Sequence, residues 1–326
     1  MIKYNDEVYG TVLIEEPVIL AVMNSAAMRR LAGVQQHGIS GLIGLTNPIT
    51  RREHSIGAML LVRRLGASLQ EQLAALLHDV SHTAFSHVID YVFDGHNSQS
   101  YHDEMKESYL SGTDIPAVLA AYGFDWHDFL DESRYSLLEQ PSPALCADRL
   151  DYFLRDGPGL GLMTADQIRW ALSHLIVHDG RIGVDNLDAA RWLGDTYMAA
   201  DRASWANFQE VGLYELTAQA IRLALEKEIL VEADIWGTDA PAWARLQNTA
   251  DPEIQAIVSL IRPETRFAWD EEKPDFRIST KLRTIDPDVQ VGGAFRPLST
   301  LDAEFGRRRL NYLNTHSGKW PMRIIR

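Results

Sequence analysis

The organisation of this chain is decided by residues 76–90, which read LLHDVSHTAFSHVID. Two leucines end an apolar run, and His78 and Asp79 follow them directly, so a hydrophobic segment carries an imidazole and a carboxylate at its end. His82 lies four residues after His78 and three after Asp79, a spacing that predicts a crowded side of one helix. Burying an unpaired carboxylate is costly, which indicates a cation or a hydrogen-bond partner for Asp79.

Two flanking segments add ligands of the same kind. Upstream, residues 51–57 (RREHSIG) bring His54 into the start of an apolar helix, and downstream, residues 147–156 (ADRLDYFLRD) contain Asp148. Together with the central pair they make a set of two imidazoles and two carboxylates. Such a set suits Mn²⁺, Fe²⁺, Co²⁺, Ni²⁺ or Zn²⁺ rather than Ca²⁺, which prefers oxygen ligands alone. An octahedral ion held by four protein groups keeps positions for water and a phosphate oxygen.

The spacing around these ligands indicates where a substrate lies. Asp148, Tyr152 and Asp156 recur every four residues, so they line one helical face from the metal outward. Arg51 lies three residues before His54, within reach of a phosphate on the metal.

The four metal-ligand candidates resemble the H…HD…D signature of the HD-domain metal-dependent phosphohydrolases. The branch that this chain resembles is the deoxynucleoside triphosphate triphosphohydrolase-like one, which includes the sterile-alpha-motif-and-HD dNTPase and bacterial dGTPases. The resemblance covers roughly the first 160 residues and continues weakly at residues 281–287. Its segments are residues 5–10, 29–31, 36, 51–57, 76–90 and 148–156.

The resemblance implies a mostly α-helical HD-domain fold with a small N-terminal β-hairpin and a small C-terminal α+β extension. We expect an HD phosphohydrolase core over residues 1–235 and an extension packed on it over residues 236–326. The residues agree, because strand-like segments at 8–9 and 11–14 flank Gly10 and the chain reads as largely helical from Pro17 to about residue 230. Alternation at residues 275–280 indicates a strand in the extension.

The resemblance also implies a role for each matched position. The metal ligands are His54, His78, Asp79 and Asp148. The catalytic group is His82, oriented by Asp90, with His102 as a second active-site histidine. The substrate-binding residues are Gln36 and Asp156 on the sugar 3′-hydroxyl, Arg51 and Arg149 on the phosphates, His87 near the 5′-oxygen and Tyr152 against the deoxyribose. One divalent transition metal is the expected cofactor, with an additional Mg²⁺ on the substrate phosphates as an option.

The expected reaction is hydrolysis of a deoxynucleoside triphosphate to a deoxynucleoside and tripolyphosphate. Asn24, Arg29 and Ala32 depart from the polar series through which the regulated animal enzyme binds activating nucleotides, so we expect no such activation here. Ala206 and Asn207 cannot supply the basic contacts that the family often makes to distal phosphates. The alternatives are therefore a nucleotidase acting on monophosphates or an unusual nucleotide, a di-iron oxygenase of the same fold that recruits His82 and His102, and a nucleotide sensor without turnover.

Composition limits the partners. The 326 residues include 31 Lys and Arg against 45 Asp and Glu, a net charge of −14, which argues against binding to extended nucleic acid or an anionic membrane. The single cysteine, Cys146, excludes an internal disulfide and fits a reducing cytoplasm. Apolar runs are too short for a membrane span, and the N-terminal residues lack a targeting pattern. We therefore expect a cytoplasmic protein with a nucleotide substrate and, from the resemblance, a homo-oligomer of at least two chains.

Overall fold

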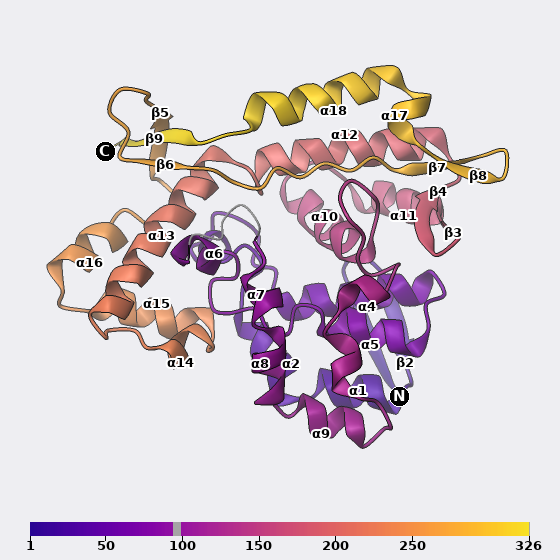
Figure 1. Ribbon diagram of the computed structural model, residues 1–326, viewed down its shortest axis with the longest axis horizontal. Coiled ribbons are helices and arrows are strands. Elements are labelled where there is room, and N and C mark those ends of the chain that lie inside the picture. Colours follow the sequence, from indigo (N-terminus) through magenta and orange to yellow (C-terminus); the bar gives the residue numbers. More distant parts are fainter. Residues whose placement is uncertain (94–98, 326) are drawn as a thin grey trace.

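The computed structural model describes residues 1–93 and 99–325, and its elements are mostly helices (Figure 1). The α-helices are α1 (Pro17–Met23), α2 (Ala26–Arg30), α3 (Ile39–Leu42), α4 (Arg51–Arg64), α5 (Leu69–Leu77), α6 (Val88–Val92), α7 (Tyr101–Glu104), α8 (Lys106–Ser111), α9 (Ile115–Ala120), α10 (Ala147–Gly159), α11 (Ala165–Ser173), α12 (Leu187–Ala203), α13 (Phe208–Glu226), α14 (Glu232–Ile235), α15 (Asp239–Asn248), α16 (Pro252–Val258), α17 (Leu298–Leu301) and α18 (Ala303–His316). The strands are β1 (Ile2–Asp6), β2 (Gly10–Ile14), β3 (Leu175–His178), β4 (Arg181–Val184), β5 (Arg266–Trp269), β6 (Phe276–Ile278), β7 (Asp288–Val291), β8 (Ala294–Pro297) and β9 (Trp320–Ile325). The expected fold class is confirmed.

The N-terminal hairpin forms, but its strands lie further apart in the sequence than expected. β1 pairs antiparallel with β2, with Asp6 opposite Gly10, and residues 7–9 form the turn rather than a strand. The Asp6 carboxylate accepts hydrogen bonds from the backbone N–H groups of Val8 and Tyr9, which stabilises the turn.

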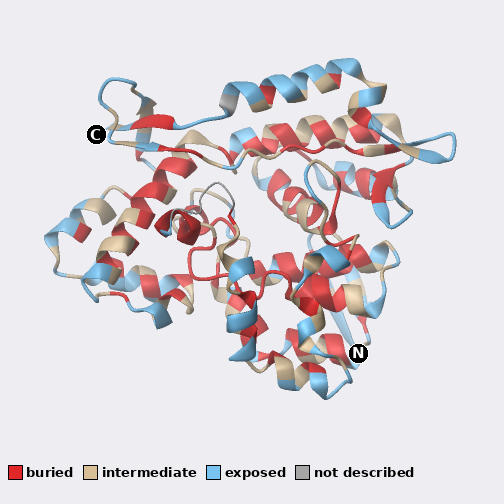
Figure 2. Cartoon of the chain, viewed as in Figure 1, coloured by how far each residue is buried: buried red, intermediate tan, exposed pale blue. Residues whose placement is uncertain are grey.

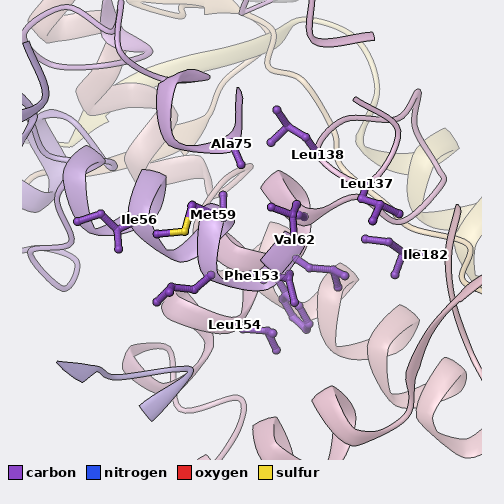
Figure 3. Packing of buried hydrophobic residues seen from close by; sticks show 14 of the residues in the cluster. Ile56, Met59, Val62, Ala75, Leu137, Leu138, Phe153, Leu154 and Ile182 are labelled. Atoms are coloured by element: carbon purple, nitrogen blue, oxygen red, sulfur yellow. The ribbon is translucent and has the colours of Figure 1, made fainter. Parts of the chain in front are cut away.

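The core of the N-terminal half is built where α4, α5 and α10 pack together. Figure 3 shows Ile56, Met59 and Val62 from α4 meeting Phe153 and Leu154 from α10. α4 begins with a full capping box between Thr50 and Glu53, which fixes its start just before the polar residues of its first turn. The same helices therefore bury the core and direct residues at their ends, the first turns of α4 and α10 and the C-terminal end of α5, toward one point.

A second cluster of buried residues surrounds α13, which packs against α6, α16 and α3. In Figure 2 most of α13 and α6 is coloured as buried, whereas the outward face of α18 is exposed. α12 lies between α10 and α18. Residues 204–207 separate α12 from α13, so the last part of the expected helical region consists of two helices.

The long helical region also contains a hairpin that the sequence analysis missed. β3 pairs antiparallel with β4 through a turn at Asp179-Gly180, where both residues have positive φ, of 49° and 69°. The expectation of helix through to about residue 230 was wrong here, although the Asp-Gly pair between two β-branched runs was the available signal.

The C-terminal segment contributes to two sheets. β7 pairs with β4 in a sheet ordered β3-β4-β7-β8, and β9 pairs with β5 and β6 in a sheet ordered β5-β9-β6. The division of the chain at residue 235 stays a prediction. Across the residues that the structure describes, every helix is too short or too polar to traverse a lipid bilayer.

Candidate metal centre and catalytic cavity

Three elements deliver the four predicted metal ligands to one point. His54 comes from the first turn of α4, His78 and Asp79 directly follow α5, and Asp148 lies in the first turn of α10. His78 caps α5, and residues 79–87 continue as turns, so the expected helical face over residues 78–82 was wrong. Phe85 and Ser86 have positive φ, of 63° and 49°, which a right-handed helix excludes.

The ligand atoms are spaced as an ion requires. His54 Nε2 lies 2.9 Å from Asp148 Oδ1 and 3.1 Å from His78 Nε2. Asp79 places its two oxygens 3.6 Å from these imidazole nitrogens, Oδ2 from His54 Nε2 and Oδ1 from His78 Nε2. Ligands at about 2.1 Å from a metal are separated by about 3.0 Å in an octahedron and about 3.4 Å in a tetrahedron. The four residues therefore fit a single divalent cation.

The outer nitrogens of both imidazoles are occupied, which orients the inner ones. His54 Nδ1 is 2.8 Å from Asp151 Oδ2, and His78 Nδ1 is 2.7 Å from the carbonyl oxygen of Ala75. A carbonyl or carboxylate acceptor holds the proton on Nδ1, so each Nε2 presents a lone pair toward the other ligands. Two lone pairs and two carboxylates facing one point repel one another unless a cation lies among them.

The charges around the site also favour a cation. Burial opposes protonation of His78, but Asp79 and Asp148 outweigh it and raise the pKa of His78 to about 10. Burial also acts against the charged form of Asp79, yet Arg51 and the neighbouring histidines hold the pKa of Asp79 well below its usual range. The site thus stabilises added positive charge, which a metal ion supplies in place of protons.

Asp151 is a functional residue that the sequence analysis did not single out. It is fully buried, and besides His54 it contacts Arg155 and the hydroxyl of Tyr9, with Tyr9 Oη 2.9 Å from Asp151 Oδ1. Arg155 in turn donates to Asp6 at 2.9 Å. This ion-pair network fixes His54 through the ring nitrogen that faces away from the other ligands. The sequence signal for Asp151 was an acidic residue three positions after Asp148.

The predicted catalytic histidines lie beside the metal set. His82 and His102 stack with ring centroids 3.8 Å apart, and His87 meets both edge-on. Burial and the charge of Arg51 hold the pKa of His82 well below its usual range, so its ring is neutral at pH 7. His82 Nε2 is 3.2 Å from Asp79 Oδ1, and neither ring nitrogen makes a hydrogen bond to residues 1–93 and 99–325.

The prediction that Asp90 orients His82 was wrong. Its Oδ2 lies 3.0 Å from His87 Nδ1, and its Oδ1 accepts from the backbone N–H of Tyr101, so it orients His87 rather than His82. The reason is geometric, because α6 begins at Val88 and places His87 and Asp90 within one turn.

The predicted sugar-binding residues gather at another part of the cavity. Asp156 accepts from His37 Nε2 at 2.9 Å and from Trp205 Nε1 at 2.7 Å, so both carboxylate oxygens are positioned by neighbours. Gln36 Oε1 is buried and has no hydrogen-bond partner in the described part of the chain. Tyr152 stands edge-on to Trp205, with centroids 4.8 Å apart. His37 and Trp205 were not among the predicted site residues.

Of the thirteen predicted site residues, eleven line one cavity of about 400 Å³, and the two that do not are His54 and Asp90. Arg51 is bound to Asp79 at 2.6 Å and to the hydroxyl of Ser86 at 3.0 Å. Arg149 donates to the carbonyl oxygens of residues 140 and 144. The cavity is also lined by Lys281 and Arg283, cations that the sequence analysis left without a role.

Acidic residues line the cavity as well. Burial and the charge of Glu132 raise the pKa of Asp103 to about 7, and burial with the charge of Asp148 raises the pKa of Glu139 to about 7. These carboxyls therefore carry less negative charge at neutral pH than their number indicates. A second group of possible ligands, Asp79, His82 and His102, has its atoms within 4.8 Å of one another.

Comparisons with known proteins find an HD domain and a metal-dependent phosphohydrolase as a relative. The HD domain family model matches residues 51–156. The chain is 37% identical over 321 residues to the metal-dependent phosphohydrolase cns2 of Cordyceps militaris, covering 96% of this chain and 92% of that protein. It is also 37% identical over 288 residues to the uncharacterized protein YdhJ of Bacillus subtilis (strain 168), covering 88% of each.

Solved structures share the fold at lower identity. A phosphohydrolase from Bacteroides thetaiotaomicron VPI-5482 superposes with a TM-score of 0.65 at 17% identity, covering 93% of this chain and 94% of that one. A hypothetical protein from Aquifex aeolicus superposes with a TM-score of 0.68 at 19% identity, covering 93% and 92%. At these identities the likeness concerns the fold alone.

Proposed function

This chain belongs to the HD-domain family of metal-dependent phosphohydrolases, and from that premise we propose that it hydrolyses a phosphate ester of a nucleotide. The substrate we put first is a deoxynucleoside triphosphate, cleaved at the phosphate nearest the sugar to give a deoxynucleoside and tripolyphosphate. One observation carries this proposal: a single cavity joins three of the four metal ligands, a neutral buried histidine, four cationic side chains and an aromatic and acidic end suited to a sugar.

The residues divide the work between binding and proton transfer. His54, His78, Asp79 and Asp148 would hold a divalent cation, which supplies Lewis-acid polarisation of a phosphoryl oxygen. Arg51 lies against this set, so its guanidinium can neutralise charge that develops on the phosphoryl group. The metal ligands and this arginine together define where the reacting phosphate lies.

His82 is the group positioned to move a proton. Because its ring is neutral and its nitrogens have no hydrogen-bond partner in the described chain, it can either accept a proton from the attacking water or, once protonated, donate one to the leaving sugar oxygen. His87, oriented by Asp90, stands edge-on to His82 and would lie near the 5′-oxygen. His102 stacks on His82 and restricts its ring orientation.

The sugar is expected between Tyr152 and the acidic end of the cavity. Tyr152 packs against Trp205, and its hydroxyl is held by that of Tyr197, so the ring has little freedom to move away from a 2′-hydroxyl. Gln36 and Asp156 face the same space and supply acceptors for the 3′-hydroxyl. This arrangement favours a deoxyribose over a ribose.

Product analysis tests the proposal. Purified protein is incubated with Mn²⁺, and separately with Fe²⁺ without oxygen, over a pool of deoxy- and ribonucleotides, with His82→Ala as the control. Deoxynucleoside plus intact tripolyphosphate, absent with the variant, is the expected result. Nucleoside with only orthophosphate would move the substrate to a monophosphate, and binding without turnover of any nucleotide would favour a sensor.

A second candidate function is supported by one observation. Asp79, His82 and His102 could hold a second ion beside the first, as a di-iron oxygenase of this fold requires. The metal content of the purified protein separates the two functions. One tightly held ion per chain supports the hydrolase with a free His82, whereas two irons per chain would favour oxygen chemistry. The homo-oligomer stays a prediction, which the mass of the protein in solution tests.

A further inference from the structure

A segment far from the HD motif in sequence forms part of the cavity wall. Residues 279–287 join β6 to β7 without regular secondary structure, and Figure 1 shows this orange stretch running across the molecule alongside α12. Four consecutive residues of it, 281–284, line the same cavity as the metal ligands. Two of the four are cationic, Lys281 and Arg283.

The segment is held on several sides. The backbone N–H of Arg283 donates to Asp201 Oδ2 of α12 at 2.9 Å, and Arg309 Nε of α18 donates to Thr284 Oγ1 at 3.0 Å. The backbone N–H of Asp286 donates to the carbonyl oxygen of Pro143 at 2.9 Å. These bonds fix the segment at Arg283 and on its C-terminal side, so the Arg283 side chain is presented at a defined position.

The charge of Arg283 is not neutralised by a carboxylate. Its guanidinium donates to the neutral amide of Gln99 and to the backbone carbonyl of Lys281, and it makes no ion pair within 4.0 Å among the residues the structure describes. Partial desolvation, together with the charges of Arg283 and Arg149, lowers the pKa of Lys281. The charges of the three cations oppose one another around one cavity, although Arg149 also pairs with Glu139 at 3.5 Å, in a chain whose net charge is −14.

We propose that Lys281 and Arg283 form a phosphate-binding arm that holds the phosphoryl groups beyond the one attached to the sugar. This inference rests on the proposed function. The reacting phosphate already has the metal set and Arg51, which is bound to Asp79 at 2.6 Å. The arm comes from a segment outside the HD motif and lines the same cavity, so its two cations remain for the phosphoryl groups past the reacting one. It supplies the cationic contacts that Ala206 and Asn207 cannot.

Matched variants isolate the arm. Lys281→Gln and Arg283→Gln remove one charge each, and Arg283→Lys keeps the charge while losing the planar fork. Arg277→Gln is the control, because Arg277 lies on β6, is exposed, and pairs with Glu271 outside the cavity. Circular dichroism and thermal unfolding check that each variant folds. Should Arg283→Gln fail to fold, Lys281→Gln decides, because Lys281 is exposed.

The measurement is calorimetric binding of tripolyphosphate and of orthophosphate to the metal-loaded protein, followed by KM and kcat with a deoxynucleoside triphosphate. We expect each Gln variant to weaken tripolyphosphate binding about tenfold or more, since hydrogen bonds to charged groups are lost. Orthophosphate binding should change less than about twofold, the nucleotide effect should fall on KM, and Arg283→Lys should recover part of the loss.

The outcomes separate the arm from the proposed function. Equal tripolyphosphate affinity in Lys281→Gln, Arg283→Gln and Arg277→Gln would overturn the arm, even with nucleotide hydrolysis intact. Failure of the unmodified protein to bind tripolyphosphate would overturn it as well. Binding of tripolyphosphate that depends on the two residues, in a protein that hydrolyses no nucleotide, would retain the arm as a polyphosphate site and refute the proposed reaction.

Discussion

Replacing Asp151 by Asn should weaken metal binding although Asp151 does not belong to the metal set. Its Oδ2 lies 2.8 Å from His54 Nδ1 and 2.8 Å from Arg155 Nε, and its Oδ1 accepts from Tyr9 at 2.9 Å and from Arg155 Nη2 at 3.0 Å. An amide has one acceptor atom where the carboxylate has two. Either the amide nitrogen faces His54, or it faces the donors of Tyr9 and Arg155.

Both orientations of the amide disturb the site. If the nitrogen faces His54, the imidazole proton must move to Nε2, where it blocks the lone pair that the metal needs. If the oxygen faces His54, the tautomer is kept, but His54 loses a carboxylate partner and becomes a weaker ligand. Loss of such an outer partner lowers metal affinity about 10- to 100-fold, or about 1.4–2.7 kcal/mol.

The variant should also lose stability, because Arg155 is buried and loses one of its two carboxylate partners. Removing one member of a buried pair costs about 3–5 kcal/mol, and we expect about 3 kcal/mol here since Asp6 continues to bind Arg155. Asp6→Asn is therefore the matched control. It disturbs the same arginine from the other side and has no contact with His54.

The assay pairs two measurements on each variant. Calorimetric titration of the metal-free protein with Mn²⁺ gives the affinity, and urea unfolding without metal gives the stability. Asp6→Asn should lose stability while keeping its affinity within about threefold, and Asp151→Asn should lose both. Equal Mn²⁺ affinity in the two variants would refute the reasoning, since it would show that His54 needs no orienting carboxylate.

Three further outcomes are expected. His82→Ala should lower kcat by about 10²- to 10⁴-fold while one metal ion per chain is retained. Steady-state rates and metal analysis check this prediction. Loss of the ion would contradict the assignment of His82 as a proton carrier. Burial raises the pKa of Asp239 to about 7, so the folded state holds a proton that the unfolded state has released between about pH 4 and pH 7. The free energy of unfolding should accordingly fall as pH rises through this window, by up to about 4 kcal/mol relative to Asp239→Asn in paired urea titrations; parallel pH curves would show the shift to be absent. Gly57→Ala would place a Cβ 2.1 Å from Asp151 Oδ1, so urea unfolding should show a loss of about 2 kcal/mol or more in the free energy of unfolding. Gly112→Ala is the control, because its Cβ would make only an ordinary contact at 3.6 Å and should lower the free energy of unfolding by less than about 1 kcal/mol.

The sequence was sufficient where function imposes a local pattern. His54, the His78-Asp79 pair and Asp148 could be recognised as one metal set from the order of residues alone, because metal ligands must be specific residue types. The face shared by Asp148, Tyr152 and Asp156 followed from helical periodicity, and α10 spans all three. The fold class followed from the same motifs, since their helices form the core.

The sequence was insufficient where a contact depends on where one element ends and the next begins, or joins distant segments. Asp90 is close to both His82 and His87 in sequence, and only the turns after α5 decided that it binds His87. Residues 175–184 form a hairpin whose second strand pairs with β7, more than a hundred residues away, which no local periodicity records.

What the sequence by itself determined is the chemistry of the centre: which side chains bind a cation and which helix carries the groups beside it. What only the tertiary structure decided is how that centre is supported and enclosed. Asp151 became the orienting partner of His54 because α4 and α10 pack together, and Lys281 and Arg283 reached the cavity because Asp201 of α12 holds the backbone of their segment at Arg283. Periodicity acts over a few residues along one element, whereas burial, ion pairing and cavity walls depend on which elements meet in space.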